Sequence, residues 1–228
     1  MAKIDLPNIT LIAVTSVKIP ETVHALLASM EGINFGEVKL VSHEQIPNLP
    51  ENIKLELAPK IVTSNQYSTF IFLELHKYIN TDYCLIIQHD GWVSSPEKWE
   101  DSWMTYDYIG APWRVNLLPG RDICPVTGEV IRVGNGGFSL RSKKILKIPS
   151  DNNLPLLSVY NSYNEDLNFC FLHRKKFLDL GIKYAPIDVA ARFSHEADTP
   201  EIHGITPFGF HSGIIHNREK LKPSKWTV

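Results

Sequence analysis

Short apolar runs alternate with amphipathic segments in the first part of the chain. Runs rich in β-branched residues predict buried strands at 9–16, 37–42 and 83–87. Between these runs, apolar residues recur at helical spacing, which predicts helices at 20–30 and 66–79. Strands that alternate with helices in this way form a largely parallel sheet with helices on its faces. The pattern therefore predicts an α/β fold, in which ligands bind outside the carboxyl ends of the strands.

The second part of the chain is less regular. The segment 92–125 is rich in Trp, Pro and Gly, which predicts loops over a surface. Residues 130–148 predict a turn, a short strand and a helix capped by Ser142. Residues 164–181 predict a further helix that ends at Gly181. Because we see no internal repeat, low-complexity tract or linker, we expect one domain over residues 1–228.

Composition and charge exclude several classes of protein. Hydrophobic residues make up 43% and charged residues 21% of the 228 residues, which is typical of a soluble globular protein. The formal net charge of -2 provides no basic field for nucleic acid or for an anionic membrane. An anionic ligand must therefore be bound locally, by a metal ion or by a few hydrogen-bond donors.

The cysteines and the N-terminal residues indicate a compartment. Cys84, Cys124 and Cys170 are far apart and odd in number, which argues against a disulfide framework and against a CxxC metal site. The N-terminal residues lack the features of a signal peptide, and no apolar run approaches the ~20 residues of a membrane span. We therefore expect a cytoplasmic protein without a transmembrane segment.

The predicted strand at 83–87 runs directly into a polar tip, "QHDGW". Asp90 and Gly91 are either a tight turn, for which Asp-Gly is a common pair, or Asp90 is a metal ligand. No matching antiparallel strand follows to complete a hairpin, which favours the ligand. A hard cation such as Mg²⁺ or Mn²⁺ takes one or two carboxylates and completes its shell with substrate phosphates. His89 is better explained as a hydrogen-bonded structural histidine.

Three later segments each have a structural and a functional interpretation. The glycines of "GNGGFSLRS" form either a turn or a loop whose backbone approaches a bulky group, and their spacing differs from GxxxxGKS and GxGxxG. Glu165 and Asp166 in "NEDLNF" either stabilise a helix N-terminus or act as catalytic carboxylates. His211 in "PFGFHSG" is either a core histidine or a ligand. The GxSxG and HExxH signatures are absent.

Together and in this order, five segments resemble those of glycosyltransferases with the GT-A fold, and in particular a bacterial group of short domains in that superfamily. The segments are "LIIQHDGW", "YDYIGAPW", "VGNGGFSLRS", "NEDLNF" and "FGFH". The resemblance spans about Tyr67 to His211. It implies a GT-A type Rossmann-like sandwich with a mostly parallel central sheet, divided into a nucleotide-binding half (1–115) and an acceptor and catalytic half (116–228).

The resemblance also implies a reaction and its partners. A hexose would move from a nucleotide sugar, UDP being our first expectation, to a hydroxyl of a glycan or glycolipid in polysaccharide biosynthesis. We expect no nucleic acid as a partner, and peripheral contact with membrane-bound biosynthetic machinery. Asp90 would match the last aspartate of the family's DxD motif and, with His211, would hold a divalent cation (Mn²⁺ or Mg²⁺). Gln88 stands where the first acid of that motif is expected.

Further roles follow from the same resemblance. Asp166 would match the catalytic aspartate, with Glu165 as its neighbour, and would act as general base in a single inverting displacement. Gly136 and Gly137 would face the donor sugar and the acceptor. Thr15 would lie near the nucleotide base, and Gln88 would belong to the same donor site.

Several residues beside the motifs keep two interpretations. Trp92, Trp113 and Phe138 either offer faces for sugar rings or pack in the core. Arg114 and Arg141 could pair with phosphate, although Arg141 at a predicted helix start could equally be solvated.

Two other functions also stay open. One is a noncatalytic sugar- or nucleotide-binding module, which Gln88 in place of an acid favours. The other is a metal-dependent phosphoesterase, although such sites usually gather more carboxylates and histidines than this chain provides.

Overall fold

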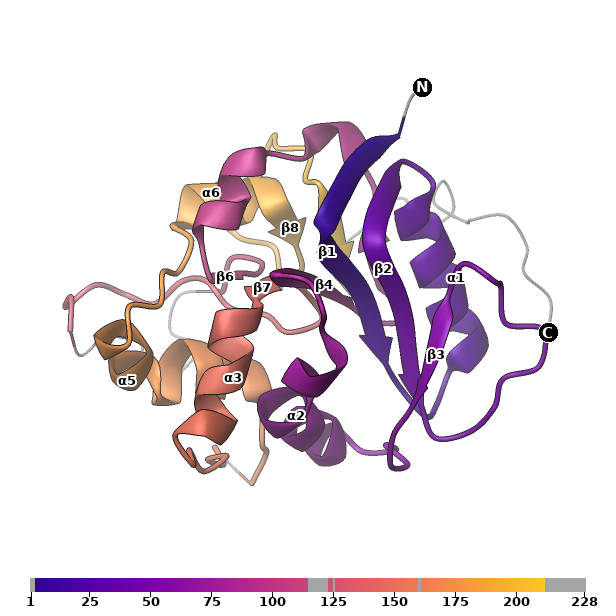
Figure 1. The fold of residues 1–228 in the computed structure, drawn as a ribbon. Helices are drawn as coiled ribbons and strands as arrows, with labels where there is room; N and C mark the ends of the chain where they lie inside the picture. Colours follow the sequence, from indigo (N-terminus) through magenta and orange to yellow (C-terminus); the bar gives the residue numbers. More distant parts are fainter. Residues whose placement is uncertain (1–2, 115–122, 125, 160, 212–228) are drawn as a thin grey trace.

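The computed structural model describes residues 3–114, 123–124, 126–159 and 161–211. Its centre is a six-stranded sheet in the order β3-β2-β1-β4-β7-β6 (Figure 1). The strands are β1 (Ile4–Val14), β2 (Ile33–Ser42), β3 (Lys54–Leu57), β4 (Tyr83–Ile87), β6 (Tyr108–Ile109) and β7 (Phe138–Ser142). The first four are parallel, whereas β7 runs antiparallel to β4, and β6 antiparallel to β7. The sheet is therefore mostly parallel, as the sequence pattern predicts.

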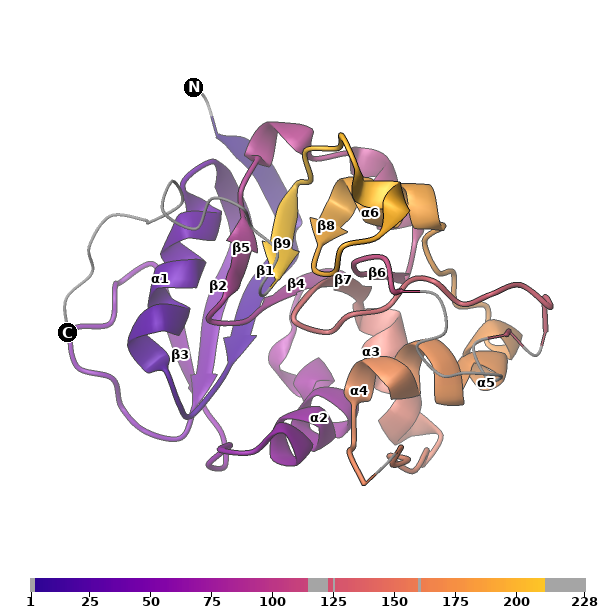
Figure 2. The same cartoon turned by 180° about the vertical axis from the view of Figure 1, so that it is seen from behind.

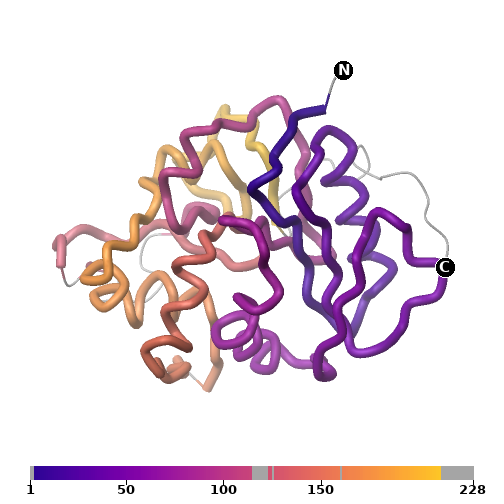
Figure 3. Tube along the Cα trace, in the orientation of Figure 1, coloured from indigo at the N-terminus to yellow at the C-terminus, as the bar shows by residue number. Residues whose placement is uncertain are grey.

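The order of the strands reverses between β1 and β4. From β1 the chain moves outward to β2 and β3, and then returns to place β4 on the other side of β1. In open α/β sheets a crevice forms at such a switch point, outside the carboxyl ends of the two strands. The tube in Figure 3 shows the N-terminal strands at one end of the sheet, with the residues that follow β7 largely toward the other.

Helices cover both faces of the sheet (Figures 1 and 2). The α-helices are α1 (Ile19–Met30), α2 (Ser64–Leu73), α3 (Lys143–Asp151), α4 (Glu165–Leu167), α5 (Arg174–Asp179) and α6 (Ile187–Phe193). Short 3₁₀ segments are η1 (Leu75–Tyr78), η2 (Pro96–Lys98), η3 (Asp101–Thr105) and η5 (Pro200–Ile202), and a π-helical segment, η4, spans Asn168–Leu172. The helices α2 to α5 lie on one face, and α1 and α6 lie on the other.

A second, three-stranded sheet lies on the same face as α1 and α6 (Figure 2). Its strands, in order, are β5 (Gly91–Val93), β9 (Gly209–His211) and β8 (Ser194–His195). Aromatic side chains fill the space between the two sheets: the ring of Trp103 meets those of Phe193 and Phe208 edge-on, and Phe138 packs against the same pair. This layer holds β9, and with it His211, against the central sheet.

The apolar character of β1 and β4 follows from their central position. In β1, Ile9 and Leu11 pack in the cluster around α1, whereas Ile12 and Val14 pack in the cluster around α2 and α3. Strands covered on both faces become continuously apolar, because every side chain is buried whichever way it points. The same alternation in β4 produces the run "CLII" recognised in the sequence.

The helix predicted over 164–181 is wrong as a single element, because it is interrupted in the middle. The side-chain amide of Asn168 donates to the carbonyls of Asn164 and Leu157, both at 2.9 Å, and its Oδ1 accepts the Leu157 N–H at 2.8 Å. This attachment to a distant loop coincides with a π-helical turn in which the His173 N–H donates to the Asn168 carbonyl at 3.2 Å. Such a turn has no signature in the spacing of apolar residues. The predicted cap of the preceding helix is confirmed: Ser142 Oγ accepts the Ile145 N–H at 3.1 Å.

Among the described residues, no helix has the length and apolar character needed to cross a membrane.

Candidate functional site

A pocket of about 240 Å³ lies at the carboxyl ends of β1 and β4, at the switch point of the sheet. Its walls come from the loop after β1, from the start of α2 with the loop before it, and from the residues that follow β4. Thr15, Tyr67 and Gln88 contribute polar groups to a wall that also contains apolar side chains, namely Val14, Val17, Ile61, Val62 and Ile87. Thr15 and Gln88 thus share one pocket, and their contacts with a donor stay a prediction.

The chain turns sharply after β4. The Gly91 N–H donates to the Gln88 carbonyl at 3.2 Å, and the next residues form β5, which pairs antiparallel with β9 so that Gly91 lies opposite His211. A Cβ at position 91 would lie 2.5 Å from the Phe210 carbonyl oxygen, so only glycine permits this approach. The two interpretations of Asp-Gly therefore do not exclude each other, because the turn is what brings Asp90 to His211.

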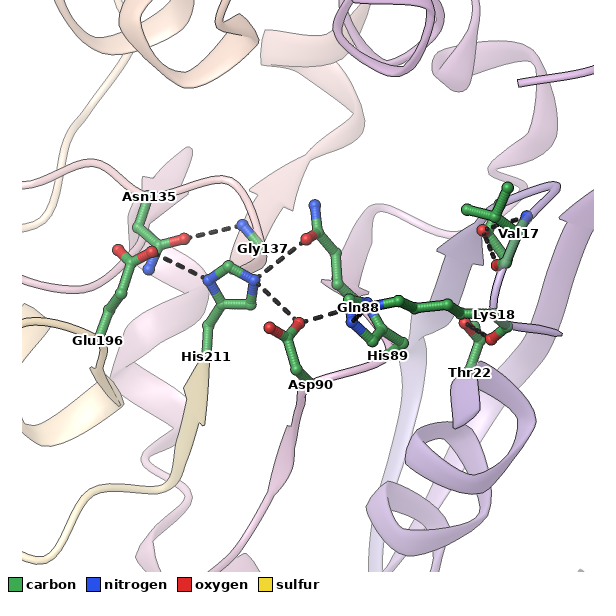
Figure 4. A network of polar contacts seen from close by, with 11 residues as sticks. Val17, Lys18, Thr22, Gln88, His89, Asp90, Asn135, Gly137, Glu196 and His211 are labelled. Atoms are coloured by element: carbon green, nitrogen blue, oxygen red, sulfur yellow. Dashed lines mark hydrogen bonds and ion pairs between the residues drawn. The ribbon is translucent and has the colours of Figure 1, made fainter. Parts of the chain in front are cut away.

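His211 is the centre of a polar network (Figure 4). Its Nε2 lies 3.1 Å from Gln88 Oε1 and 3.3 Å from Asp90 Oδ1. Its Nδ1 lies 3.0 Å from Glu196 Oε1. Glu196 directly follows β8, the strand that pairs with β9. Asp90 and His211, which the resemblance implies as ligands of one cation, thus lie together, and their role as ligands stays a prediction. Glu196 has no counterpart in the sequence prediction.

Electrostatics in this network favour the charged forms. Burial alone would lower the pKa of His211, but the contacts with Asp90 and Glu196 raise that pKa to about 9. Burial would raise the pKa of Asp90, but the interaction with His211 lowers it to about 2. At neutral pH the network therefore contains an imidazolium between two carboxylates.

The residues present fit a divalent cation. Asp90 Oδ1 is buried and, among the described residues, accepts no hydrogen bond, although His211 Nε2 lies 3.3 Å away. The Gln88 amide oxygen faces the same ring nitrogen, so two oxygens and one nitrogen converge. A cation could take the place of the Nε2 proton there. In the described part of the chain no group of three or more His, Cys, Asp or Glu is placed to hold a metal, so substrate oxygens would have to complete the shell.

His89 has a structural partner, in keeping with its sequence interpretation. Its Nε2 lies 2.8 Å from the Nζ of Lys18, in the loop between β1 and α1, and its Nδ1 lies 3.5 Å from Asp90 Oδ1 (Figure 4). Burial lowers the pKa of His89, which favours the neutral ring as an acceptor for the Lys18 ammonium. Lys18 itself adopts a left-handed backbone conformation, with φ 50°. The pair ties the first loop of the sheet to the polar tip of β4.

The glycine pair of "GNGG" lies against two side chains of the candidate site. A Cβ at Gly137 would lie 2.2 Å from His211 Nε2, and one at Gly136 would lie 1.9 Å from Glu165 Oε1. The loop is held by Asn135, at φ 66°, whose Oδ1 accepts the Gly137 N–H at 2.8 Å. Of the two alternatives for these glycines, the structure supports close approach of the backbone to bulky groups, and those groups are protein side chains. Their approach to the donor sugar and acceptor stays a prediction.

Glu165 and Asp166 differ in their surroundings. Glu165 is buried and its Oε1 accepts a hydrogen bond from Arg141 Nη2 at 2.9 Å. Arg141 is completely buried, so a solvated position for this residue is wrong. Asp166 is only partly buried, and its Oδ1 accepts the Leu167 N–H at 2.7 Å. Burial and the nearby charge of Glu165 raise the pKa of Asp166 to about 7. Asp166 is therefore the carboxylate suited to exchange a proton near neutral pH.

The aromatic residues of the prediction lie inside the fold. Phe138 is completely buried in the layer between the two sheets, and Trp113, 8% exposed, covers Gly134. Neither presents an open ring face, so neither offers a surface for a sugar ring. Trp92 is partly buried and packs edge-on against Phe210. Arg114 is exposed.

Comparison with known structures identifies the class of fold. The chain is similar to the galactosyltransferase LgtC in complex with donor and acceptor sugar analogues, with a TM-score of 0.50, 14% identity, and coverage of 89% of this chain and 86% of the other. An active-site mutant of LgtC gives a TM-score of 0.49 at 13% identity over the same shares, 89% and 86%. The synthetase of CMP:2-keto-3-deoxy-manno-octonic acid, complexed with CTP, gives 0.41 at 11% identity, covering 80% of this chain and 88% of the other. The protein has a GT-A-like fold.

The family is shown by sequence. The chain belongs to the family described as "Protein of unknown function (DUF5672)", whose profile matches residues 53–211. A search of the curated proteins gives no match. The matched segment contains Gln88, Asp90, Glu165, Asp166 and His211.

Proposed function

We propose that this protein is a nucleotide-sugar-dependent glycosyltransferase that transfers a hexose to a hydroxyl of a glycan or glycolipid. The observation that carries the proposal is that Gln88 lines the switch-point pocket and also contacts His211, which lies beside Asp90. The helix α4, which carries Asp166, packs against α2 in the wall of the same pocket. The likeness to the fold of LgtC, whose structure contains donor and acceptor sugar analogues, supports the same class of reaction. UDP is our first expectation for the nucleotide.

The residues suggest a single displacement. The acceptor hydroxyl attacks the anomeric carbon while its proton passes to the Asp166 carboxylate. With a pKa of about 7, Asp166 is suited to accept that proton near neutral pH. The bond from the anomeric carbon to the phosphate oxygen breaks, and its electron pair leaves with the nucleoside diphosphate. The ammonium of Lys18 provides positive charge near the pocket for that leaving group. Attack opposite the leaving group inverts the anomeric configuration.

A divalent cation, Mn²⁺ or Mg²⁺, would be held by Asp90 and His211, with Gln88 as a neutral third ligand. Such an ion, when bound, supplies charge stabilisation for a diphosphate. Glu196 would then accept a hydrogen bond from Nδ1–H of His211, which leaves the lone pair of Nε2 free to bind the cation beside Asp90.

A noncatalytic sugar- or nucleotide-binding module is the second candidate. It is favoured by the small number of acidic and histidine ligands in the described residues. The same observation argues against a metal-dependent phosphoesterase, because such sites usually gather several of these ligands.

Calorimetric titration of nucleotide sugars, with and without Mn²⁺, is the first test. We expect at least one nucleotide sugar to bind, and to be hydrolysed slowly or transferred to an acceptor, with the anomeric configuration of the product determined by NMR. Binding without turnover would favour the noncatalytic module. Absence of binding to every nucleotide sugar would contradict both candidates.

A further inference from the structure

Tyr67 has a polar group that the fold leaves without a partner. Its side chain lines the switch-point pocket together with Gln88. The Gln88 side chain partly offsets the rise in the Tyr67 pKa as a hydrogen-bonding neighbour, but the buried hydroxyl makes no hydrogen bond of ordinary length and angle with any residue that the structure describes. A buried hydroxyl without a partner costs free energy, so folded proteins rarely contain one. Because the hydroxyl is buried behind the pocket surface, a ligand can supply the missing partner once the Tyr67 or Gln88 side chain turns.

The backbone that carries Tyr67 is fixed by a capping box at the start of α2. Thr63 Oγ1 accepts the Gln66 N–H at 3.2 Å, and Gln66 Oε1 accepts the Thr63 N–H at 3.1 Å. The Tyr67 N–H in turn donates to the Thr63 carbonyl at 3.0 Å. The helix α2 also packs against α4, which carries Glu165 and Asp166. The phenol therefore lies in the pocket wall close to the helix that carries the two carboxylates.

The charges around the pocket indicate which part of a donor would meet Tyr67. Burial and the negative charges of Glu165 and Asp166 raise the pKa of Tyr67, so its hydroxyl stays neutral. These carboxylates would repel a diphosphate, whereas they are compatible with a neutral, hydroxyl-bearing group. The ammonium of Lys18 lies 2.8 Å from Nε2 of His89, which lines another part of the pocket, and a positive charge there suits the phosphates. A sugar therefore fits the Tyr67 end of the pocket better than a phosphate does.

We propose that the Tyr67 hydroxyl hydrogen-bonds a hydroxyl of the transferred sugar and thereby contributes to the choice of donor. This inference rests on the proposed function and adds a residue that the sequence motifs do not contain.

The variant Tyr67→Phe tests the proposal, because it removes only the hydroxyl. Its affinities for UDP and for UDP-glucose and UDP-galactose would be measured by calorimetry, or for the corresponding pair of whichever nucleotide the wild-type protein binds. We expect about three- to tenfold weaker binding of the nucleotide sugar, the range for one lost neutral hydrogen bond, and unchanged binding of the nucleoside diphosphate. The thermal midpoint of Tyr67→Phe should equal or exceed that of the wild type.

Tyr184→Phe is the matched control. The Tyr184 hydroxyl donates to the Phe169 carbonyl at 2.6 Å, so its removal should lower the thermal midpoint and leave both affinities unchanged. Unchanged sugar affinity in Tyr67→Phe, or an equal loss for the nucleoside diphosphate, would overturn the role of Tyr67 while the wild-type binding still supported the proposed function. A wild-type protein that binds neither ligand would overturn both.

Discussion

Arg141 and Glu165 form an ion pair in the interior of the protein, with 2.9 Å between Nη2 and Oε1 and side-chain exposures of 0% and 7%. The guanidinium also lies 4.8 Å from the ring centroid of Tyr108 and 5.0 Å from that of Phe169. The pair connects β7, the strand after the glycine loop, to α4, the helix that carries Asp166. It therefore fixes the candidate base relative to the central sheet.

Breaking this pair from one side should be strongly destabilising. Glu165→Gln leaves a buried guanidinium without a counter-charge, and we expect a loss of about 3 to 5 kcal/mol in the free energy of unfolding. The double variant Arg141→Met/Glu165→Gln should lose less than the single variant, because no unpaired charge remains. Urea denaturation measures both. The exposed pair of Lys175 and Asp179, 2.7 Å apart, is the control: Lys175→Met should change stability by less than about 0.5 kcal/mol.

A Cβ at position 137 should disturb the site through His211. In Gly137→Ala the new methyl group would collide with the imidazole, and the surrounding layer leaves His211 little room to move. We expect Mn²⁺-dependent nucleotide affinity to fall at least about tenfold, with a stability loss of about 1 to 3 kcal/mol from overpacking. Calorimetry and thermal melting would measure these effects. Unchanged nucleotide affinity in a folded Gly137→Ala variant would show that the position of the His211 ring does not matter for binding.

The fold could be predicted from the sequence because its signals are local. The double-sided burial of β1 and β4 makes both strands continuously apolar, and the spacing of Val23 and Leu26 marks the buried side of α1. Glycines at 136 and 137 indicate either a turn or a close approach of the backbone to a bulky group. Nothing in the local sequence identifies His211 and Glu165 as the groups approached. Those contacts depend on how distant segments pack.

The residues whose roles the sequence does not indicate share that dependence on long-range contacts. Glu196 reaches His211 only because β8 pairs with β9, and it lies in a loop without periodicity. Arg141 occupies a strand position next to Ser142, where a charged residue ordinarily indicates exposure, and its burial depends on Glu165 from another element. Tyr67 lies among the apolar residues of α2, so the sequence does not indicate that its hydroxyl lacks a hydrogen-bond partner beside a pocket.

Asp166→Asn should separate catalysis from stability. Because burial and Glu165 raise the pKa of Asp166 from 3.8 to about 7, the unfolded chain loses this proton at lower pH than the folded chain. Ionised Asp166 therefore reduces stability progressively as pH rises from 3.8 to about 7. The Asn variant keeps the acceptor for the Leu167 N–H and avoids this loss. We expect it to be at least as stable as the wild type near pH ~8, and without advantage near pH ~4.

The same variant should lose transfer activity by a factor of about 10² or more while it keeps donor binding. In the wild type, kcat/KM should rise with pH through about 7, as the base ionises. Loss of donor binding with unchanged turnover, or a product that retains the anomeric configuration of the donor, would contradict the assignment of Asp166 as the base.

The proton on His211 should make the metal-free protein sensitive to alkaline pH. Because Asp90 and Glu196 raise this pKa from 6.5 to about 9, the stabilisation is complete below pH 6.5 and is lost as pH rises through about 9. One pKa unit corresponds to about 1.4 kcal/mol, so we expect a decrease of roughly 3 to 4 kcal/mol in the presence of EDTA, measured by urea denaturation. Glu196→Gln should flatten this pH dependence, and an unchanged profile in that variant would contradict the role of Glu196.

Gln88 offers the most direct test of the cation site. The amide oxygen of Gln88 already faces His211 Nε2 at 3.1 Å, beside Asp90 Oδ1, so Gln88→Glu would add a second carboxylate with little change in shape. Since hard cations prefer anionic oxygen ligands, we expect Mn²⁺ affinity to increase about tenfold or more, measured by calorimetry without nucleotide. Gln88→Leu should reduce the affinity instead, and Asp90→Asn should reduce it further. If Gln88→Glu binds Mn²⁺ no better than the wild type, the new carboxylate pairs with the His211 imidazolium, and the cluster is an ion-pair network in place of a metal site.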